Sequence, residues 1–322
     1  MSDPAARIID GNLLAQQHRE RIAARAHALR ERHGPAAVRL DAVLVASGDN
    51  GARVYAMNQA KTCQALGIEY RLHELPAGAT YDDIAGRVLL LNTDEAVSAI
   101  MLHMPLPEGV DPYRVQRLIA PEKDVEGVNP ANIGNVVYGR SSLAPCTGLA
   151  VAKMCEWVIE QQVGVPEAGG KMPAGWLRGK LAVVVGASDV VGKPIAVLLM
   201  RQDATVVSCN KWTPGLADLC RRADVLVAAA GVPELITADM VKPGAIVIDV
   251  GVNRVKGADG KSKTVGDVCF AEVSKVLGGA GWLSPVPGGV GPMTVAMLLL
   301  NVVEASERRV SLRLSGGEFQ GA

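Results

Sequence analysis

Short β-branched runs alternate with helical stretches in two parts of this sequence, and this alternation limits the possible folds more than any other feature. The first series begins with "LDAVLV", followed by a helical stretch over residues 51–66 and the run "IEYRLHEL". The second begins after Lys180 with "LAVVVG", a helix from Gly192, and the runs "ATVVSC", "DVLVAAA" and "GAIVIDVG". Such alternation predicts parallel sheets with helices on both faces. We therefore expect two α/β domains.

The composition excludes several classes of protein. A chain of 322 residues with 49% apolar and 20% charged residues is typical of a globular protein with two cores. Its 33 basic and 33 acidic residues balance, so we expect neither nucleic acid nor an anionic membrane as its main partner. The N-terminus carries no apolar signal segment, and no apolar run approaches the roughly 18 residues of a membrane span. We therefore expect a cytoplasmic protein.

The cysteines and histidines give no sign of a metal site. Six cysteines are scattered without a CxxC pair, which favours reduced thiols in a chain of this size. Five histidines show neither an HxxxH spacing nor clustered acids. The sequence predicts no bound metal.

A candidate nucleotide site follows the first strand of the second series. In "VVVGASDVVGKP", Gly186 ends the strand, Gly192 opens a helix, and Pro194 suits the first helical turn. A helix N-terminus with free amide groups binds phosphate readily. The spacing departs from GxGxxG, because Ser188 holds the middle position and the last glycine comes one residue late. A tight turn that binds nothing is the alternative.

The end of the next strand bears on the choice of cofactor. In NAD-binding domains an Asp or Glu at this place binds the ribose 2′-hydroxyl. Here "SCNKWT" provides Asn210 and Lys211 and no acid. A cation suits a 2′-phosphate, so the sequence favours NADP, while NAD and a merely solvated Lys211 stay open as alternatives.

The stretch "RVYAMNQAKTCQALG" predicts one helix that ends at Gly67. Tyr55 and Gln59 lie one turn apart on the same face. Lys61 is six residues beyond Tyr55, which at about 100° per residue directs it roughly 120° away around the helix. We therefore expect this face to present a neutral amide while the amine points elsewhere.

The run "SPVPGGVGPMTVAMLLLN" closely resembles the signature of the bifunctional methylenetetrahydrofolate dehydrogenase/methenyltetrahydrofolate cyclohydrolase family. Gly289 and Gly291 carry no side chain, so such a loop brings backbone close to a ligand. Further matches follow in the family's order: "RIIDGNLLA", "VYAMNQAKTCQALGI", "LHMPLP", "PEKDVEGVNPANIG", "APCT", "VVVGASDVVGKP", "PGAIVIDVGVNR" and "VGDV". The resemblance covers residues 7–305, with the Gly/Pro-rich region 161–179 longer than expected.

The resemblance implies a two-domain α/β fold with a cleft between the domains. Residues 1–147 and 288–322 would form an N-terminal folate-binding catalytic domain, with a final helix from Pro292 to about Ala305 packed back on it and a frayed tail after Glu307. Residues 148–287 would form a Rossmann-type NADP-binding domain, through which the family forms homodimers. Members oxidise 5,10-methylenetetrahydrofolate by hydride transfer and hydrolyse the methenyl product to 10-formyltetrahydrofolate.

By motif, the resemblance also assigns roles to individual residues. The substrate-binding set is Tyr55, Leu102, His103, Met104, Glu126, Pro287, Gly288, Gly289, Val290 and Gly291. The cofactor-binding set is Gly186, Ala187, Ser188, Lys211 and Val252, in which Ala187 replaces an arginine of the family pattern. The catalytic candidates are Tyr55, Gln59, His103 and Glu126.

Three of these candidates depart from the family pattern. Gln59 replaces the catalytic lysine, His103 replaces a glutamine that orients that lysine, and Glu126 replaces an aspartate that holds the pterin. An amide cannot titrate, so Gln59 leaves the proton-transfer role vacant. His103 would fill that role because imidazole titrates near neutrality, or it is only a polar strand-end residue. Glu126 keeps a carboxylate for the pterin, or it only caps a turn.

Hydride transfer asks less of the side chains, because the cofactor carries the chemistry. We therefore expect NADP-dependent oxidation of 5,10-methylenetetrahydrofolate in one-carbon metabolism, with cyclohydrolase activity weak or lost. Two alternatives stay open. The same fold would act on a different pterin, one-carbon adduct or imine with NADP(H), or it would be a folate-binding pseudoenzyme without turnover.

Overall fold

The structure is a computed structural model that describes residues 5–46, 51–140, 143–164, 172–256 and 262–314. The chain folds into two compact units, which we name after their sheets. The three-strand unit comprises residues 16–146 and 298–322, and the six-strand unit comprises residues 1–15 and 147–297. Both sheets are parallel, so the expected α/β class with two domains is confirmed. The predicted domain boundaries stay a prediction.

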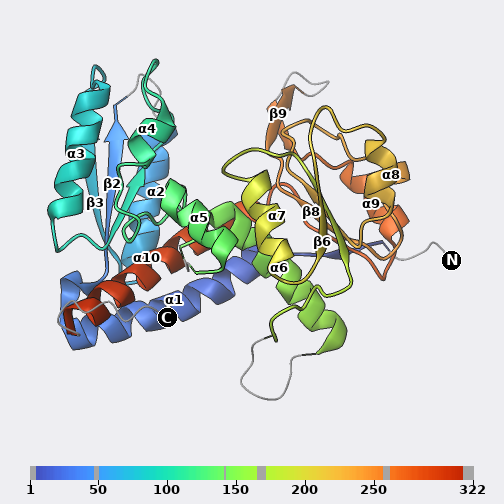
Figure 1. The fold of residues 1–322 in the computed structure, drawn as a ribbon, viewed down its shortest axis with the longest axis horizontal. Helices are drawn as coiled ribbons and strands as arrows, with labels where there is room; N and C mark the ends of the chain where they lie inside the picture. The colour runs from blue at the N-terminus through green and yellow to red at the C-terminus, as the bar shows by residue number, and fades with distance from the viewer. Residues whose placement is uncertain (1–4, 47–50, 141–142, 165–171, 257–261, 315–322) are drawn as a thin grey trace. The chain divides into compact units, whose positions relative to one another are not determined.

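The three-strand unit is built on a sheet with β2 in the centre (Figure 1). Its strands are β2 (Arg39–Val45), β3 (Glu69–Leu75) and β4 (Ala99–Leu102). Its helices are α2 (Gly51–Ala65), α3 (Tyr81–Thr93), α4 (Pro112–Gln116) and α5 (Pro130–Tyr138), with η1 (Pro35–Ala37) and most of α1 (Gly11–His33). β2 is buried along its whole length, as a strand covered on both faces must be.

Alternate residues of the strands serve the two faces of this sheet. Val43 and Val45 of β2 pack with Ile100 of β4 and with Ile84 and Val88 of α3 in one apolar cluster. Figure 1 shows α3 and α2 on opposite sides of the strands. The other face of the sheet is therefore the one that α2 covers, and it carries the candidate residues described below.

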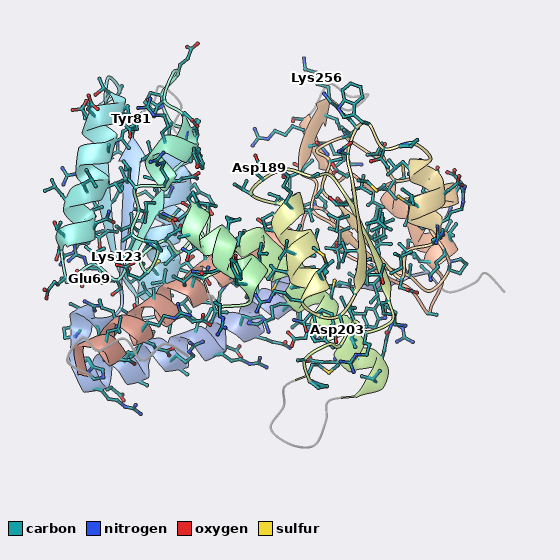
Figure 2. The ribbon with its side chains drawn as sticks, viewed as in Figure 1. Glu69, Tyr81, Lys123, Asp189, Asp203 and Lys256 are labelled. Carbon is teal, nitrogen blue, oxygen red and sulfur yellow. The ribbon has the colours of Figure 1, made fainter. Side chains whose placement is uncertain are left out.

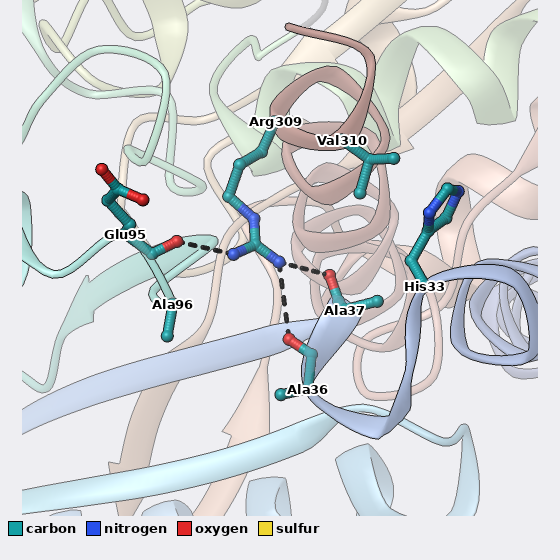
Figure 3. A pocket seen from close by; sticks show the side chains of 7 residues that line it. All are labelled: His33, Ala36, Ala37, Glu95, Ala96, Arg309 and Val310. Carbon is teal, nitrogen blue, oxygen red and sulfur yellow. Dashed lines mark hydrogen bonds between the residues drawn. The ribbon is translucent and has the colours of Figure 1, made fainter. Parts of the chain in front are cut away.

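The C-terminal helix α10 (Val290–Leu314) is longer than the sequence predicted. Arg309 donates hydrogen bonds to the carbonyl oxygens of Glu95 (2.6 Å), Ala36 (3.4 Å) and Ala37 (2.9 Å) beside a cavity of about 490 Å³ (Figure 3). These bonds tie the helix to the rest of the three-strand unit beyond Glu307. The expectation of a frayed tail directly after Glu307 is therefore wrong up to Leu314, because composition alone does not reveal such an anchor.

The same helix also corrects the expectation about apolar runs. By length and composition alone, the helix over residues 290–312 is long and apolar enough to cross a membrane. However, 61% of the most apolar window of this helix is buried inside the protein. Such burial is typical of the core helix of a globular protein.

The six-strand unit contains a sheet in the order β1-β11-β8-β7-β5-β6. Its strands are β1 (Arg7–Ile8), β5 (Leu181–Val185), β6 (Thr205–Cys209), β7 (Val225–Ala228), β8 (Ile246–Asp249) and β11 (Trp282–Leu283). Its helices are α7 (Gly192–Met200), α8 (Leu216–Arg221) and α9 (Phe270–Leu277), with η2 (Ala238–Met240) and most of α6 (Cys146–Val163). An antiparallel hairpin of β9 (Asn253–Lys256) and β10 (Ser262–Val265) stands apart from the sheet.

The strand order changes direction at β5, which pairs with β6 on one side and β7 on the other. In open parallel sheets, ligands bind beyond the carboxyl ends of the strands at such a switch point. The turn after β5 is the sequence-predicted nucleotide site, so topology and motif agree on the same place.

Candidate active site

Helix α2 presents Tyr55 and Gln59 on one face and Lys61 on another. Gln59 is only 4% exposed, Tyr55 is half-exposed, and Lys61 is exposed. The phase expected from the sequence is therefore confirmed: the amine lies off the face that carries the amide. Both polar atoms of the Gln59 carboxamide are buried and have no hydrogen-bond partner among the described residues.

His103 lies against Tyr55 and is held by a residue that the sequence did not single out. The rings of Tyr55 and His103 meet edge to face, with 5.9 Å between their centroids. On the other side, the Tyr70 hydroxyl lies 2.9 Å from Nε2 of His103, and the His103 backbone amide donates to the carbonyl of Val43. Tyr70 lies in β3, whose alternation marks it only as a strand residue, so no sequence signal identified it.

Burial changes the chemistry expected of His103. The residue is 3% exposed, and desolvation lowers the pKa of its imidazole to about 4. At neutral pH the ring is therefore uncharged, and almost none of it is in the imidazolium form that acts as an acid. The interpretation of His103 as a proton carrier that titrates near neutrality is wrong on this point, because the sequence does not show how deeply the ring is buried.

Glu126 supplies the carboxyl group of this site. Its Oε2 accepts a hydrogen bond of 3.2 Å from the backbone amide of Leu102, the residue before His103. Burial raises the pKa of the Glu126 carboxyl to about 7; the Leu102 amide opposes this shift and the charge of Asp124 adds to it. Burial raises the pKa of the Tyr55 hydroxyl, and the charge of Glu126 raises it further. The Glu126 carboxyl therefore lies close enough to Tyr55 for the two groups to interact electrostatically.

The segment before Glu126 is fixed on both sides. Lys123 (labelled in Figure 2) donates to three carbonyl oxygens at the end of α3, and its own carbonyl accepts from Ile100 of β4. Asp124, fully buried, accepts from the Asn129 amide (2.7 Å) and the Asn132 side chain (2.9 Å). The turn is thus capped by Asp124, which leaves the Glu126 carboxyl on the edge of β4.

The structure therefore brings Tyr55, His103 and Glu126 together in the three-strand unit, with Gln59 one turn from Tyr55. Leu102 is buried in the core and contributes its backbone amide, whereas Met104 is 40% exposed. The peptide bond between Met104 and Pro105 is cis. The catalytic and substrate-binding roles of these residues stay predictions.

The pKa of His103 leads to a prediction about stability. An imidazole whose folded pKa is about 4 and whose unfolded pKa is about 6.5 binds its proton first in the unfolded state. Its burial therefore costs the protein stability as the pH falls from 6.5 to 4. Replacing His103 by Gln should reduce the stability lost between pH 7 and pH 5 by about 1–2 kcal/mol. Urea unfolding at the two pH values measures this, and equal losses in variant and wild type would contradict it.

In the six-strand unit, the turn after β5 approaches neighbouring backbone too closely for side chains. Gly186 has φ +111°, and a Cβ there would lie 2.0 Å from the carbonyl oxygen of Ala229. A Cβ on Gly192 would lie 1.9 Å from the carbonyl oxygen of Gly186. The first turn of α7 thus packs directly on the end of β5, which is the geometry that a dinucleotide pyrophosphate needs.

Two polar residues of this turn are already engaged. Ser188 Oγ accepts from the Gly192 amide at 3.3 Å, and its side chain is exposed. Asp189 (Figure 2) forms an ion pair with Lys193. Ala187, half-buried, contributes no charge. The turn therefore offers mainly backbone amides to an anion.

The remaining predicted cofactor residues lie at the ends of β6 and β8. Lys211 follows β6, is exposed, and places its Nζ 4.9 Å from the centroid of the Trp212 ring. Asn210 shapes this turn by accepting from the Trp212 amide. Val252 follows β8 and is 70% exposed. All five predicted cofactor residues thus lie in the six-strand unit after β5, β6 or β8, and their roles stay predictions.

The glycine-rich loop lies at the start of α10, in the part of the chain that belongs to the six-strand unit. Pro287 and Gly291 are exposed, whereas Gly289 and Val290 are buried and Gly288 has φ +102°. A Cβ on Gly289 would lie 2.5 Å from the carbonyl oxygen of Pro285. Gly289 is therefore packed closely against backbone of its own chain, whereas no atom outside its own helix lies within 4 Å of a Cβ built on Gly291; that the loop brings its backbone close to a ligand stays a prediction.

Two buried aspartates brace the loops of the six-strand unit. Asp267 Oδ2 accepts from the amides of Ala230 (2.7 Å) and Gly231 (2.8 Å), beyond β7. Asp249 accepts from the amides of Gly251, Asp267 and Val268, and burial raises the pKa of its carboxyl to about 6. The motifs "VGDV" and "VIDVG" carry both residues, but the sequence gives no sign that their side chains hold these loops.

We expect Asp267→Asn to destabilise the protein by about 1–3 kcal/mol, because the amide cannot accept at every position that the carboxylate fills. Asp203→Asn is the matched control in the same unit: Asp203 (labelled in Figure 2) is exposed, and among the described residues its side chain forms an ion pair with Arg178. Its loss should stay within about 0.5 kcal/mol. Urea unfolding of both variants measures the difference, and equal effects would contradict the bracing role.

The described residues contain no group of three or more His, Cys, Asp or Glu that could hold a metal ion. All six cysteines are free, and five of them are buried. Two of the buried thiols lie near the site residues: Cys146, on which the charge of Glu126 acts, and Cys63, which interacts with Tyr70.

Together, the features define a class: an α/β protein with a Rossmann-type nucleotide unit and a second unit that carries a tyrosine, an amide, an imidazole and a carboxyl. Two family models match the chain. Residues 9–126 match the tetrahydrofolate dehydrogenase/cyclohydrolase catalytic domain, and residues 172–310 match the NAD(P)-binding domain of the same family. The chain belongs to the tetrahydrofolate dehydrogenase/cyclohydrolase family.

Individual relatives agree with this. The bifunctional protein FolD of Methylibium petroleiphilum is 44% identical over 95% of this chain and 99% of its own length. The bifunctional FolD dehydrogenase/cyclohydrolase of Campylobacter jejuni has a TM-score of 0.82 at 34% identity, over 95% of this chain and all of its own. The Trypanosoma brucei dehydrogenase-cyclohydrolase, solved with NADP cofactor and inhibitor, has a TM-score of 0.80 at 33% identity, over 95% of this chain and 99% of its own.

Proposed function

We propose that this protein oxidises 5,10-methylenetetrahydrofolate to 5,10-methenyltetrahydrofolate with NADP, and that its cyclohydrolase activity is weak or lost. The three-strand unit would bind the folate and the six-strand unit the cofactor. The relatives named above are dehydrogenase/cyclohydrolases, which supports the substrate and the reaction. We further propose a cytoplasmic homodimer with a small-molecule folate as its ligand, without a nucleic acid or membrane partner.

The turn between β5 and α7 is the observation that carries the oxidation. Gly186 and Gly192 let the backbones of strand and helix meet. Because the amides of Gly192 and Lys193 already donate to Ser188 and Pro194 has no amide hydrogen, a pyrophosphate would be held by the backbone amides of the turn that precedes α7. Lys211 and Asn210, with no acid among the described residues of that turn, suit a 2′-phosphate and favour NADP over NAD. Bound nicotinamide supplies the hydride acceptor, so the chain has only to bind, orient and exclude water.

The three-strand unit supports oxidation better than hydrolysis. Tyr55 offers an aromatic face to the pterin, and Glu126 offers a carboxyl to its amino-amide edge. Hydrolysis of the methenyl bridge needs a group that moves a proton at the attacked carbon or the leaving nitrogen. Gln59 cannot titrate, and His103 is uncharged at neutral pH. Only Glu126, among the four catalytic candidates, exchanges a proton near pH 7.

The test mixes purified protein with 5,10-methylenetetrahydrofolate and either NADP or NAD, and follows NADPH or NADH absorbance together with the methenyl and formyl products. We expect NADP reduction, accumulation of the methenyl species and slow appearance of the formyl product. No reduction of either cofactor would remove the proposal. Binding of folate without reduction would favour the pseudoenzyme instead.

A further inference from the structure

The groups around the candidate folate site of the three-strand unit suit a ligand that carries a positive charge. Gln59 and Tyr55 are neutral at physiological pH, and burial keeps His103 uncharged. The groups that face Glu126 are Tyr55, Asp124 and the thiol of Cys146, and none of them is a cation. Among these described neighbours, every group is neutral or acidic.

Gln59 adds a second observation that points to a ligand. Its carboxamide is almost fully buried, yet neither its oxygen nor its nitrogen has a partner among the described residues. An unpaired buried amide costs free energy of desolvation, so such groups normally have partners in the functional state. Tyr55 and Cys63 lie one turn before and one turn after Gln59 on the same face of α2, and both raise the pKa of the Tyr70 hydroxyl on β3. The Gln59 amide therefore lies in the layer between α2 and β3.

His103 is not the missing hydrogen-bond partner of the Gln59 amide, because it is hydrogen-bonded to Tyr70. The Tyr70 hydroxyl occupies Nε2 of His103, and burial raises the pKa of that hydroxyl, so it stays a neutral phenol. Tyr70 and His103 thus satisfy each other without creating a charge. The carboxamide is left as a neutral donor and acceptor beside the aromatic ring of Tyr55.

We infer that this site selects the cationic methenyl form of the folate over neutral folates, with Glu126 as the attracting charge and Gln59 as an uncharged hydrogen-bonding partner. This inference rests on the proposed function and names the species that the site is built to hold. It also gives position 59 a role in specificity, because an uncharged side chain there does not repel the cation.

The chemistry of the oxidation supplies the reason. A C–H bond of the methylene bridge breaks, and both its electrons leave with the hydrogen as hydride to the nicotinamide. The folate thereby gains one positive charge, shared between its two bridge nitrogens, while the cofactor loses one. An ammonium group at position 59 would repel this new charge, whereas a carboxamide does not. At a separation of about 5 Å such repulsion is worth about fourfold in affinity at the dielectric constant of water and more than about a hundredfold at an effective value of about 20, so about tenfold is expected in a partly screened site.

The test compares two folates that share the ring system and differ in charge: 5,10-methenyltetrahydrofolate, a cation, and 5-formyltetrahydrofolate, whose pterin is neutral. Dissociation constants are measured on the full chain by stopped-flow fluorescence, before the cation hydrolyses in solution. The variants are Glu126→Gln, which removes the negative charge, and Gln59→Lys, which adds a positive one. Lys61→Gln is the matched control, because it changes a charge on the exposed side of the same helix.

We expect the preference of the wild type for the cation to fall about tenfold in each site variant and to stay unchanged in the control. The wild-type preference should also weaken as the pH falls from 8 to 6, because Glu126 takes up a proton near pH 7. Circular dichroism establishes that each variant is folded, and Gln59→Met tests position 59 again without a charge. That variant should keep the preference.

The outcomes separate this inference from the proposed function. If the wild type binds both folates equally well, or if both charge variants keep the wild-type preference, the inference is wrong while the proposed oxidation stands. If the wild type binds neither folate and reduces no cofactor, the proposed function fails and the inference fails with it. A preference that responds to Lys61→Gln as strongly as to the site variants would mean that general surface charge, not this site, attracts the cation.

Discussion

Replacing Gln59 by Lys should raise the rate of methenyltetrahydrofolate hydrolysis by at least about tenfold, since a positioned proton carrier commonly contributes 10²–10⁴-fold to such steps. The new amine would lie on the face of α2 that carries Tyr55, in a position that is 4% exposed. Burial lowers the pKa of a lysine, so an amine at this position that is mainly charged still exchanges its proton more readily than a solvated lysine does. Loss of methenyl absorbance with time measures the rate.

Two further variants make this result interpretable. Gln59→Met removes the amide without adding an amine and should leave hydrolysis slow. Gln59→Lys combined with His103→Gln restores both residues of the family pattern at once. If the single variant is folded and hydrolysis stays flat while the double variant gains activity, the imidazole held by Tyr70 is the obstacle. If neither gains activity, the vacant amine is not the reason for slow hydrolysis.

Replacing Gly186 by Ala should destabilise the protein by about 2–4 kcal/mol and remove measurable NADP binding. Its φ of +111° is strained for any residue with a side chain, and the added Cβ would lie 2.0 Å from the backbone oxygen of Ala229. Relief requires β5 and the loop after β7 to separate, which would misplace the turn that precedes α7. Urea unfolding and NADP titration measure the two effects.

Gly86 provides a control of opposite sign. It lies inside α3, and no atom lies within 4 Å of a Cβ built there, apart from its own helix and chain neighbours. Gly86→Ala should therefore stabilise the protein by about 0.5–1 kcal/mol, because alanine is the better helix former. A stable, NADP-binding Gly186→Ala protein would show that the turn adapts and that its close packing is not needed.

The alternation of strands and helices was predictable because it depends on local sequence. "LDAVLV" and "LAVVVG" became β2 and β5 with boundaries shifted by a residue at most, since continuous apolar runs are buried wherever parallel strands are central. The phase of α2 was predictable for the same reason: helical geometry alone separates Gln59 from Lys61. Both conclusions needed no knowledge of distant parts of the chain.

What could not be predicted depends on residues far apart in the chain. Tyr70 and His103 are 33 residues apart, and only the pairing of β3 and β4 with β2 brings them within hydrogen-bonding distance. The low pKa of His103 and the high pKa of Glu126 follow from burial, which a motif does not report. The same holds for Asp267, whose partners at Ala230 and Gly231 lie beyond another strand.

The anchoring of α10 by Arg309 has a practical consequence for protein engineering. Two carbonyl oxygens of η1 and the carbonyl oxygen of Glu95 accept hydrogen bonds from the Arg309 guanidinium, which thereby binds segments that are more than 200 residues earlier in the chain. A truncation that removes the polar C-terminal segment would delete these hydrogen bonds if the cut fell before Arg309. Truncated versions made for crystallisation should therefore keep the chain at least through Leu314.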